Sequence, residues 1–230
     1  MKGRAIILDH IGDVEVAAYM VDGKLDDLLI DHPAAPRQGA IYRGICDRPI
    51  KGQGGMMLRL PDGETAFLRA GKGLRPGQPL LVQVTGHAED GKAVPVTDRV
   101  LFKSRYAIVT PGKPGLNISR QITEEDTRDN LMAIAHSVFD SEHGLILRSS
   151  CEGADGEEIA EDIVAMLALA DAVLADATGA EPEALTEGDG PHTIAWREWA
   201  SVATVVTDAG SFDTHGVLDQ LAMLDGPLVR

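Results

Sequence analysis

Short runs of alternating apolar and polar residues dominate the first hundred positions of the chain. Such a run predicts a strand wherever turn residues bound it, because successive side chains of a strand point to opposite faces. On this pattern, residues 4–8 and 14–21 form a hairpin around a Gly-Asp turn, and a third strand follows at 24–30. Prolines and a glycine then interrupt the pattern between residues 32 and 39, which predicts a boundary there.

Five more short strands are expected in the next part of the chain, separated by turns that contain proline or glycine. Proline presets φ and glycine accepts positive φ, so each of these turns marks a chain reversal. Five short strands over about 60 residues suit a small closed barrel, and the five-stranded OB-fold is a barrel of this kind that binds oligonucleotides. The expected strands are residues 40–46, 55–60, 65–69, 80–85 and 93–97.

The following stretch mixes strands with longer helical patterns. A strand at 106–109 precedes a helix at whose start Thr123 and Asp126 resemble a capping box, and another strand is expected at 144–150. A long helix begins near Asp155, and its apolar stripe marks a core-facing side. The remaining expected features are a linker or exposed loop at 179–190, a strand at 202–206 and a helix at 217–224. The pattern as a whole predicts an α+β protein.

The composition is that of an ordinary globular protein, with 44% hydrophobic and 25% charged residues. The two cysteines, Cys46 and Cys151, are far apart and lack metal-ligand spacing, so neither a disulfide nor a zinc site is expected and a reducing cytoplasm fits. The longest apolar stretch, residues 163–170, is less than half of a membrane span. These features predict a cytoplasmic protein without membrane association.

The charge is distributed unevenly. The net charge is −15, yet residues 41–120 hold 13 of the 21 lysines and arginines and only six of the 36 acidic residues. A basic module in an acidic protein indicates a surface for a polyanion, because cations placed against phosphates give non-specific nucleic-acid affinity. The alternative is a domain that is rich in cations for no functional reason.

Five short segments, taken in order, resemble the N-terminal half of the ribonuclease E/G family. They are Gly39–Gly44, Leu81–Val84, Arg105–Pro111, Ile118–Ile122 and Gly144–Ser149. The resemblance implies a multi-domain α+β fold in which an OB-type barrel and an α/β sensor region are inserted into a split RNase H-like subdomain. The implied parts are residues 1–34 and 191–230 for the split subdomain, 35–104 for an S1-type OB domain, and 105–190 for a sensor of RNA 5′ ends.

The resemblance also implies where the chemistry of the family lies. Its members cut RNA with magnesium held by two aspartates of a DNase I-like subdomain, one of them in an Asp-Val/Ile-Asn motif. The nearest string here is Arg128-Asp129-Asn130, and it lies within a predicted helix. We therefore expect no catalytic residue, metal ligand or cofactor in this chain, and magnesium only for a complete family member.

The same resemblance assigns a site for the RNA 5′ monophosphate. Arg148 and Ser149 match the arginine and threonine that grip the phosphate, and a guanidinium fork with a hydroxyl can meet several phosphate oxygens. Ser104 and Ile108 match backbone positions of the same pocket. The alternative for Arg148 is an ion pair with a neighbouring acid at a strand edge.

Three further residues are implied to contact RNA. Phe67 matches an aromatic on which bases stack, Lys92 matches a lysine on the RNA backbone, and Arg120 adds charge near the phosphate pocket. Met57 stands where the family has a second aromatic. The alternatives are a core position for Phe67 and solvated surface positions for Lys92 and Arg120.

Near the C-terminus, Asp208, Asp213 and His215 form a polar cluster. A metal or hydrolytic site is one interpretation, and loop and helix-capping chemistry ahead of the helix at 217–224 is the other, which we favour. None of the seven histidines shows an i, i+4 ligand spacing.

Together these observations predict RNA binding and 5′-monophosphate recognition as part of an endoribonuclease, a hydrolase of RNA processing and decay. The expected partner is single-stranded RNA, preferably 5′-monophosphorylated, and self-association into a homo-oligomer is left open. This chain is expected to bind RNA without cutting it. The alternatives are a non-catalytic RNA-binding or regulatory module and a protein-interaction domain.

Overall fold

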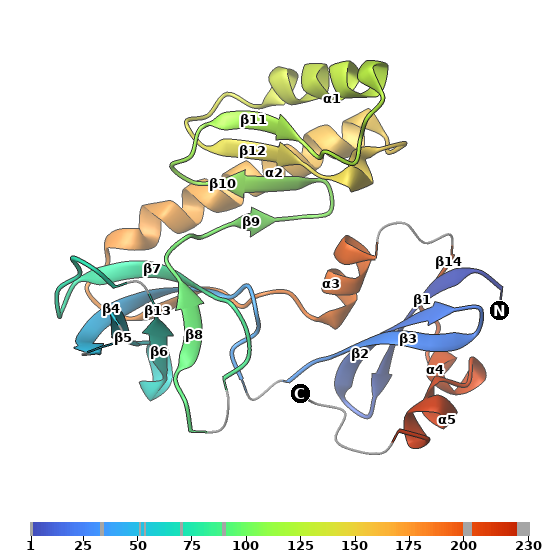
Figure 1. Cartoon of the computed structure of the whole chain (residues 1–230), viewed down its shortest axis with the longest axis horizontal. Coiled ribbons are helices and arrows are strands. Elements are labelled where there is room, and N and C mark those ends of the chain that lie inside the picture. Colours follow the sequence, from blue (N-terminus) through green and yellow to red (C-terminus); the bar gives the residue numbers. More distant parts are fainter. Residues whose placement is uncertain are drawn as a thin grey trace. The chain divides into compact units, whose positions relative to one another are not determined.

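The computed structural model describes residues 2–32, 35–50, 52, 54–69, 71–88, 91–199 and 204–224 (Figure 1). The chain divides into two compact units. The first comprises Met1–Arg37 and Asp189–Arg230, and the second comprises Gln38–Gly188. Both mix strands with helices, as the sequence pattern predicts. Within the described ranges, no helix is long and apolar enough to cross a membrane.

The first unit is a four-stranded sheet in the order β14-β1-β2-β3. Its elements are β1 (Arg4–Ile11), β2 (Val14–Val21), β3 (Lys24–Ile30), α3 (Pro191–Glu198), β14 (Thr204–Val206), α4 (Ser211–Thr214) and α5 (Val217–Ala222). Strands β1 to β3 form an antiparallel meander, which confirms the predicted hairpin and third strand, and β14 joins β1 in parallel. The predicted strand at 202–206 is seen from Thr204 onward, because its first two residues lie outside the described ranges.

Both faces of this sheet are buried. Ala5 and Ile7 pack with Phe212 and other residues of α4 and α5, while Ile6 packs on the opposite face with Ala195 of α3. Successive apolar residues of β1 thus face opposite sides of the sheet, one set packing against α4 and α5 and the other against α3.

Asp9 near the end of β1 fixes the start of α4. Its carboxylate is buried and accepts hydrogen bonds from the backbone N–H of Phe212 at 3.1 Å and from Ser211 Oγ at 3.3 Å. Burial alone raises the pKa of this carboxyl, but these bonds and one from the backbone of His10 hold the pKa below its ordinary value.

The second unit contains a closed barrel of five strands, as predicted. They are β4 (Ile41–Ile50), β5 (Gly55–Arg59), β6 (Thr65–Leu68), β7 (Pro79–Val84) and β8 (Val94–Thr97), with a 3₁₀ turn η1 (Pro61–Gly63) between β5 and β6. The strands pair in the order β4-β5-β6-β8-β7, and a further pairing of β7 with β4 closes the ring. This arrangement is consistent with an OB-type barrel.

A sixth strand, β13 (Glu183–Thr186), pairs with β4 where the sequence predicted only a linker or loop. The reason is that β5 occupies only the part of the β4 edge from Ile45 to Ile50. The rest of that edge, from Ile41 to Arg43, remains available and pairs with β13.

The buried guanidinium of Arg43 fastens the segment that leads into β13. Its Nε donates to the Glu181 carbonyl at 2.9 Å, and its two terminal nitrogens donate to the Asp176 carbonyl and the Glu183 carboxylate. The guanidinium also fills the space beside Gly179, where a Cβ would lie 2.6 Å from Nε. We call this set of contacts the Arg43 clamp.

A second sheet, in the order β11-β12-β10-β9, completes this unit. Its elements are β9 (Phe102–Lys103), β10 (Ala107–Thr110), β11 (Gly115–Ile118), α1 (Glu125–Val138), β12 (Gly144–Leu147), η2 (Ser149–Cys151), α2 (Gly156–Ala175) and η3 (Asp176–Thr178). Strands β11 and β12 are parallel, and β10 runs antiparallel to β12. Leu145 and Leu147 form a core with Leu131 of α1 and Ile163 of α2.

The helix boundaries agree with the sequence at one helix and differ at the other. Asp155 caps α2, as expected, by accepting from the Glu157 N–H at 2.7 Å. The predicted capping box of Thr123 and Asp126 is wrong, because Glu124 is the N-cap of α1 and accepts from the N–H groups of the next turn. The longer Glu124 side chain reaches those groups and satisfies them.

Candidate functional site

A row of outward-facing side chains crosses four strands of the barrel. Met57 of β5 pairs with Phe67 of β6, Phe67 pairs with Pro95 of β8, and Arg48 of β4 pairs with Met57. A register shift between Cys46 and Arg48 brings Arg48 into this row. Neighbouring strand residues share one face of a sheet, so the four side chains lie side by side on the outside of the barrel.

Phe67 belongs to this outer surface and not to the barrel core. Its chain neighbours Ala66 and Leu68 are buried at 0% and 2% exposure, whereas Phe67 itself is half-buried. Ring atoms Cε2 and Cζ lie over Gly55, in the space that a Cβ at that position would occupy. The alternative interpretation of Phe67 as a core residue does not describe its position.

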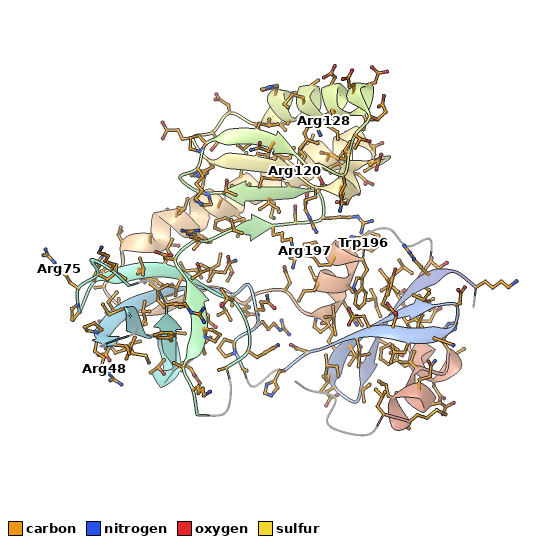
Figure 2. All side chains as sticks on the ribbon, in the orientation of Figure 1. Arg48, Arg75, Arg120, Arg128, Trp196 and Arg197 are labelled. Carbon is orange, nitrogen blue, oxygen red and sulfur yellow. The ribbon has the colours of Figure 1, made fainter. Side chains whose placement is uncertain are left out.

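Arginines flank this aromatic. Arg59 follows Met57 at the next outward position of β5, and Arg69 follows Phe67 two residues along. Both are exposed, and the Arg48 side chain is 70% exposed while its Nη1 contacts Asp47 at 3.3 Å. Figure 2 shows Arg48 extending away from the barrel. We call Arg48, Met57, Arg59, Phe67 and Arg69 the barrel face.

Sequence reasoning did not single out the three arginines of the barrel face. The spacing of two residues in Met57-Leu-Arg59 and in Phe67-Leu-Arg69 contains the signal for two of them. The position of Arg48 follows from the register shift, which the pattern does not reveal. Lys92 is exposed in the turn before β8, and residues 89–90 of that turn lie outside the described ranges.

A second group of polar residues lies along the side of the other sheet where strands β11 and β12 end. Because β11 and β12 are parallel, their C-terminal ends meet, and the Ser119 N–H donates to the Leu147 carbonyl at 2.8 Å. Arg120 follows Ser119, and Arg148 and Ser149 follow Leu147. Arg120 and Ser149 are exposed, and Arg148 is half-buried.

Arg148 is held by the turn between β9 and β10. Its backbone N–H donates to the Tyr106 carbonyl at 2.8 Å, and its Nη1 donates to the Ser104 carbonyl at 2.6 Å. A longer contact of 3.3 Å joins Nη1 to the Arg105 carbonyl. The guanidinium therefore sits where the ends of three strands come together. We call Ser104, Arg120, Arg148 and Ser149 the sheet edge.

The turn that holds Arg148 is itself tied to α2. Ser104 Oγ accepts from the Ala107 N–H at 3.1 Å and contacts Asp162, and the Tyr106 N–H donates to the same carboxylate at 3.1 Å. Ile108, the other predicted pocket residue, is half-buried in the middle of β10 and pairs with Ile146. The structure thus joins Arg148 to Ser104 directly and places Ile108 farther along the strand.

Arg128 is a further cation beside this edge that the sequence did not indicate as a site residue. Its Nη1 donates to the Ile122 carbonyl at 2.9 Å and to the Ser119 carbonyl at 3.2 Å. These bonds steady the backbone on either side of Arg120, and Figure 2 labels both arginines. The position of Arg128 depends on where α1 begins relative to the end of β11, which only the fold determines.

For the polar cluster of Asp208, Asp213 and His215, the helix-capping part of the favoured interpretation is wrong. The N-caps of α4 and α5 are Gly210 and Gly216, which have no side chain with which to cap, and the first turn of α4 is held by Asp9 of β1. Asp208 contributes its carbonyl to a turn instead, accepting from the Ser211 N–H at 3.1 Å. In the described part of the chain, no group of three or more histidine, cysteine or acidic residues is placed to hold a metal ion.

Comparison with known proteins finds sequence similarity to ribonucleases. Residues 102–214 match the Ribonuclease E/G family. Ribonuclease G of Escherichia coli (strain K12) is 26% identical over 169 residues, which is 63% of this chain and 35% of that protein. Ribonuclease E of Nostoc sp. is 25% identical over 191 residues, covering 76% and 28%. The aligned region thus spans about a third of the length of these relatives.

Proposed function

The chain belongs to the ribonuclease E/G family, and from this premise we propose that its second unit binds single-stranded RNA within an endoribonuclease of RNA processing and decay. The barrel face carries this proposal. An outward, half-buried Phe67 offers a surface on which an unpaired base can stack, and stacking contributes about 1–3 kcal/mol per base. Arg48, Arg59 and Arg69 supply cations for the phosphates between stacked bases.

The salt dependence of RNA binding tests this proposal. With about 3–5 phosphate contacts, the affinity for a single strand should fall roughly 100–3,000-fold between about 50 and 500 mM salt, since each contact adds about −0.7 to the slope. Fluorescence anisotropy of a labelled oligonucleotide measures this. Arg59→Gln should make the slope shallower by about 0.7, whereas Lys24→Gln, which removes the same charge from the first unit, should leave it unchanged.

Phe67→Ala should weaken binding about 5–150-fold without changing the salt slope, because it removes a base contact and no charge. An affinity that is flat across the salt range, or a Phe67→Ala variant that binds like the wild type, contradicts the assignment of the barrel face.

We propose a second role for the sheet edge, the recognition of a 5′ monophosphate. A terminal phosphate carries about −1.5 to −2 charges at neutral pH, and Arg120, Arg148 and Ser149 offer two cations and a hydroxyl to it. Their positions directly after the paired ends of two parallel strands support this role. Ser104 holds the turn against which Arg148 rests, so its part is to position the guanidinium.

Matched RNAs with a 5′ monophosphate or a 5′ hydroxyl test the role of the sheet edge. Charge-assisted hydrogen bonds at a partly exposed site support a preference of about 5–50-fold for the phosphate. Arg148→Ala should abolish the preference but also leaves the carbonyls of Ser104 and Arg105 without their donor. Ser149→Ala and Arg120→Gln therefore carry the test, because both side chains are exposed. An undiminished preference in both variants contradicts the assignment.

Three further assignments follow from the same premise. The barrel corresponds to an S1-type OB domain with Lys92 as an added backbone contact, and the first unit corresponds to the split RNase H-like subdomain. Magnesium would serve strand cleavage in a complete family member.

A further inference from the structure

Gly55 at the start of β5 lacks a side chain because another residue occupies that space. Its φ is not among the left-handed values of the chain, so the backbone conformation does not require glycine. A Cβ here would lie 2.6 Å from Phe67 Cζ, closer still to Cε2, and 2.9 Å from the Leu68 carbonyl. Glycine inside a strand is unfavourable for the free energy of folding, which makes an occupied Cβ position informative.

The register of β5 and β6 explains how the ring reaches this glycine. Phe67 pairs directly with Met57, so Gly55 is its diagonal neighbour, two residues along β5. Aromatic side chains are long enough to reach diagonal neighbours. The ring therefore leans along the strand toward Gly55 and away from the pair formed by Arg59 and Thr65.

We propose that Gly55 is a positioning residue that lays the Phe67 ring against the strand, so that its outer face is presented to an unpaired base. The inference rests on the proposed RNA-binding function of the barrel face. With a side chain at position 55 the Leu68 carbonyl must shift, and the ring must rotate away from the barrel surface and lose the orientation in which a base can stack on it. Because every nucleobase has a flat face, such a surface accepts single-stranded RNA regardless of its sequence.

If Gly55 and Phe67 have a purely structural role, the binding experiments should give a different result. Aromatic rings that cover a glycine on a neighbouring strand also stabilise sheets. In that case Gly55→Ala would lower the stability of the barrel and weaken every ligand to the same extent. A positioning role instead makes the loss depend on the bases of the RNA and on the presence of the ring.

A double-mutant cycle on the whole chain separates the two roles. The affinities of the wild type, Gly55→Ala, Phe67→Ala and the double variant are measured for a short oligouridine and for an abasic strand of equal length. Gly55→Ala should weaken oligouridine binding about 5–20-fold, part of the full stacking contribution, with an unchanged salt slope. It should leave the abasic strand unaffected and cause no further loss in the Phe67→Ala background.

Gly44→Ala is the matched control for inserting a methyl group into the barrel. Its Cβ would meet the flexible Leu58 side chain at 3.1 Å and does not touch Phe67. It should bind both strands like the wild type. Equal weakening of both strands by Gly55→Ala, an additive loss in the double variant, or no loss at all overturns the inference.

The wild-type protein provides a measurement that needs no stable variant. The ring current of Phe67 shifts the Hα resonances of Gly55 in the NMR spectrum away from their ordinary positions, and oligouridine should move them while the abasic strand should not. Absence of the shift overturns the inference. If Phe67→Ala weakens oligouridine binding and Gly55→Ala does not, only the positioning role fails. If Phe67→Ala has no effect, the proposed function of the barrel face fails with it.

Discussion

Removing the Arg43 clamp should destabilise the second unit more than the removal of any exposed arginine. Arg43→Ala withdraws three contacts at once, to the carbonyls of Asp176 and Glu181 and to the carboxylate of Glu183. It also opens the space beside Gly179 that the guanidinium fills.

The magnitude follows from the burial of each partner. The Arg43 side chain is 9% exposed and that of Glu183 is 55% exposed, so the ion pair itself contributes only about 0–1 kcal/mol. The two carbonyls each lose a hydrogen bond to a charged donor, at about 1.5–3 kcal/mol. We therefore expect Arg43→Ala to lower the free energy of unfolding by about 3–7 kcal/mol.

Hydrogen exchange measured by mass spectrometry locates the effect. Peptides that cover residues 176–186 should exchange faster in Arg43→Ala, because the clamp holds η3 and β13 on the barrel. Peptides of the first unit should be unchanged. Arg48→Ala on the same strand is the control: its pair with Asp47 is largely exposed, and its loss should cost under about 1 kcal/mol. Similar unfolding curves for the two variants, or unchanged exchange at 176–186, would refute the reasoning.

Two further predictions concern titratable groups. Because the folded-state pKa of Asp9 lies below its ordinary value, its contribution to stability is present above about pH 4 and is lost as the pH falls through the folded pKa. The fluorescence of Trp196 and Trp199, both in the first unit, should show acid unfolding that is less pH-dependent in Asp9→Asn than in the wild type; equal dependence contradicts the role of Asp9. Burial raises the pKa of the Cys151 thiol to about 11 and also raises that of Cys46, so iodoacetamide at neutral pH should label both slowly until denaturant is added. Fast labelling of the native protein would show that these thiols are accessible.

The strands of the barrel were predictable because each of them carries its own local signal. Alternation and Pro-Gly turns mark β5 and β6 wherever the rest of the chain lies. β13 escaped prediction because its sequence resembles a loop and it becomes a strand only through the free edge of β4 and the Arg43 clamp. A local sequence pattern does not predict strand pairing between residues that are far apart in the chain.

In the candidate site, too, one position could be predicted from the local sequence and others only from the fold. Alternation around Phe67 places it outside the barrel once the strand is known. Arg120 and Arg148 follow neighbouring strand ends only because β11 and β12 pair in parallel, although a whole helix separates these strands in the sequence. The roles of Arg148, Ser149, Lys92 and Arg120 in RNA binding stay predictions.

The first unit is assembled from two distant parts of the chain, and this has a consequence for how the protein is made. Ile6 of β1 pairs with Val205 of β14, and the Leu25 N–H donates to Gln220 Oε1 at 2.8 Å. A ribosome therefore delivers all of Gln38–Gly188 before the last strand and helices of the first unit exist. During that interval β1 has an unpaired edge and the meander has uncovered apolar faces, both of which invite association with other nascent chains. Completing the first unit therefore has to wait until its C-terminal strand and helices have been synthesised.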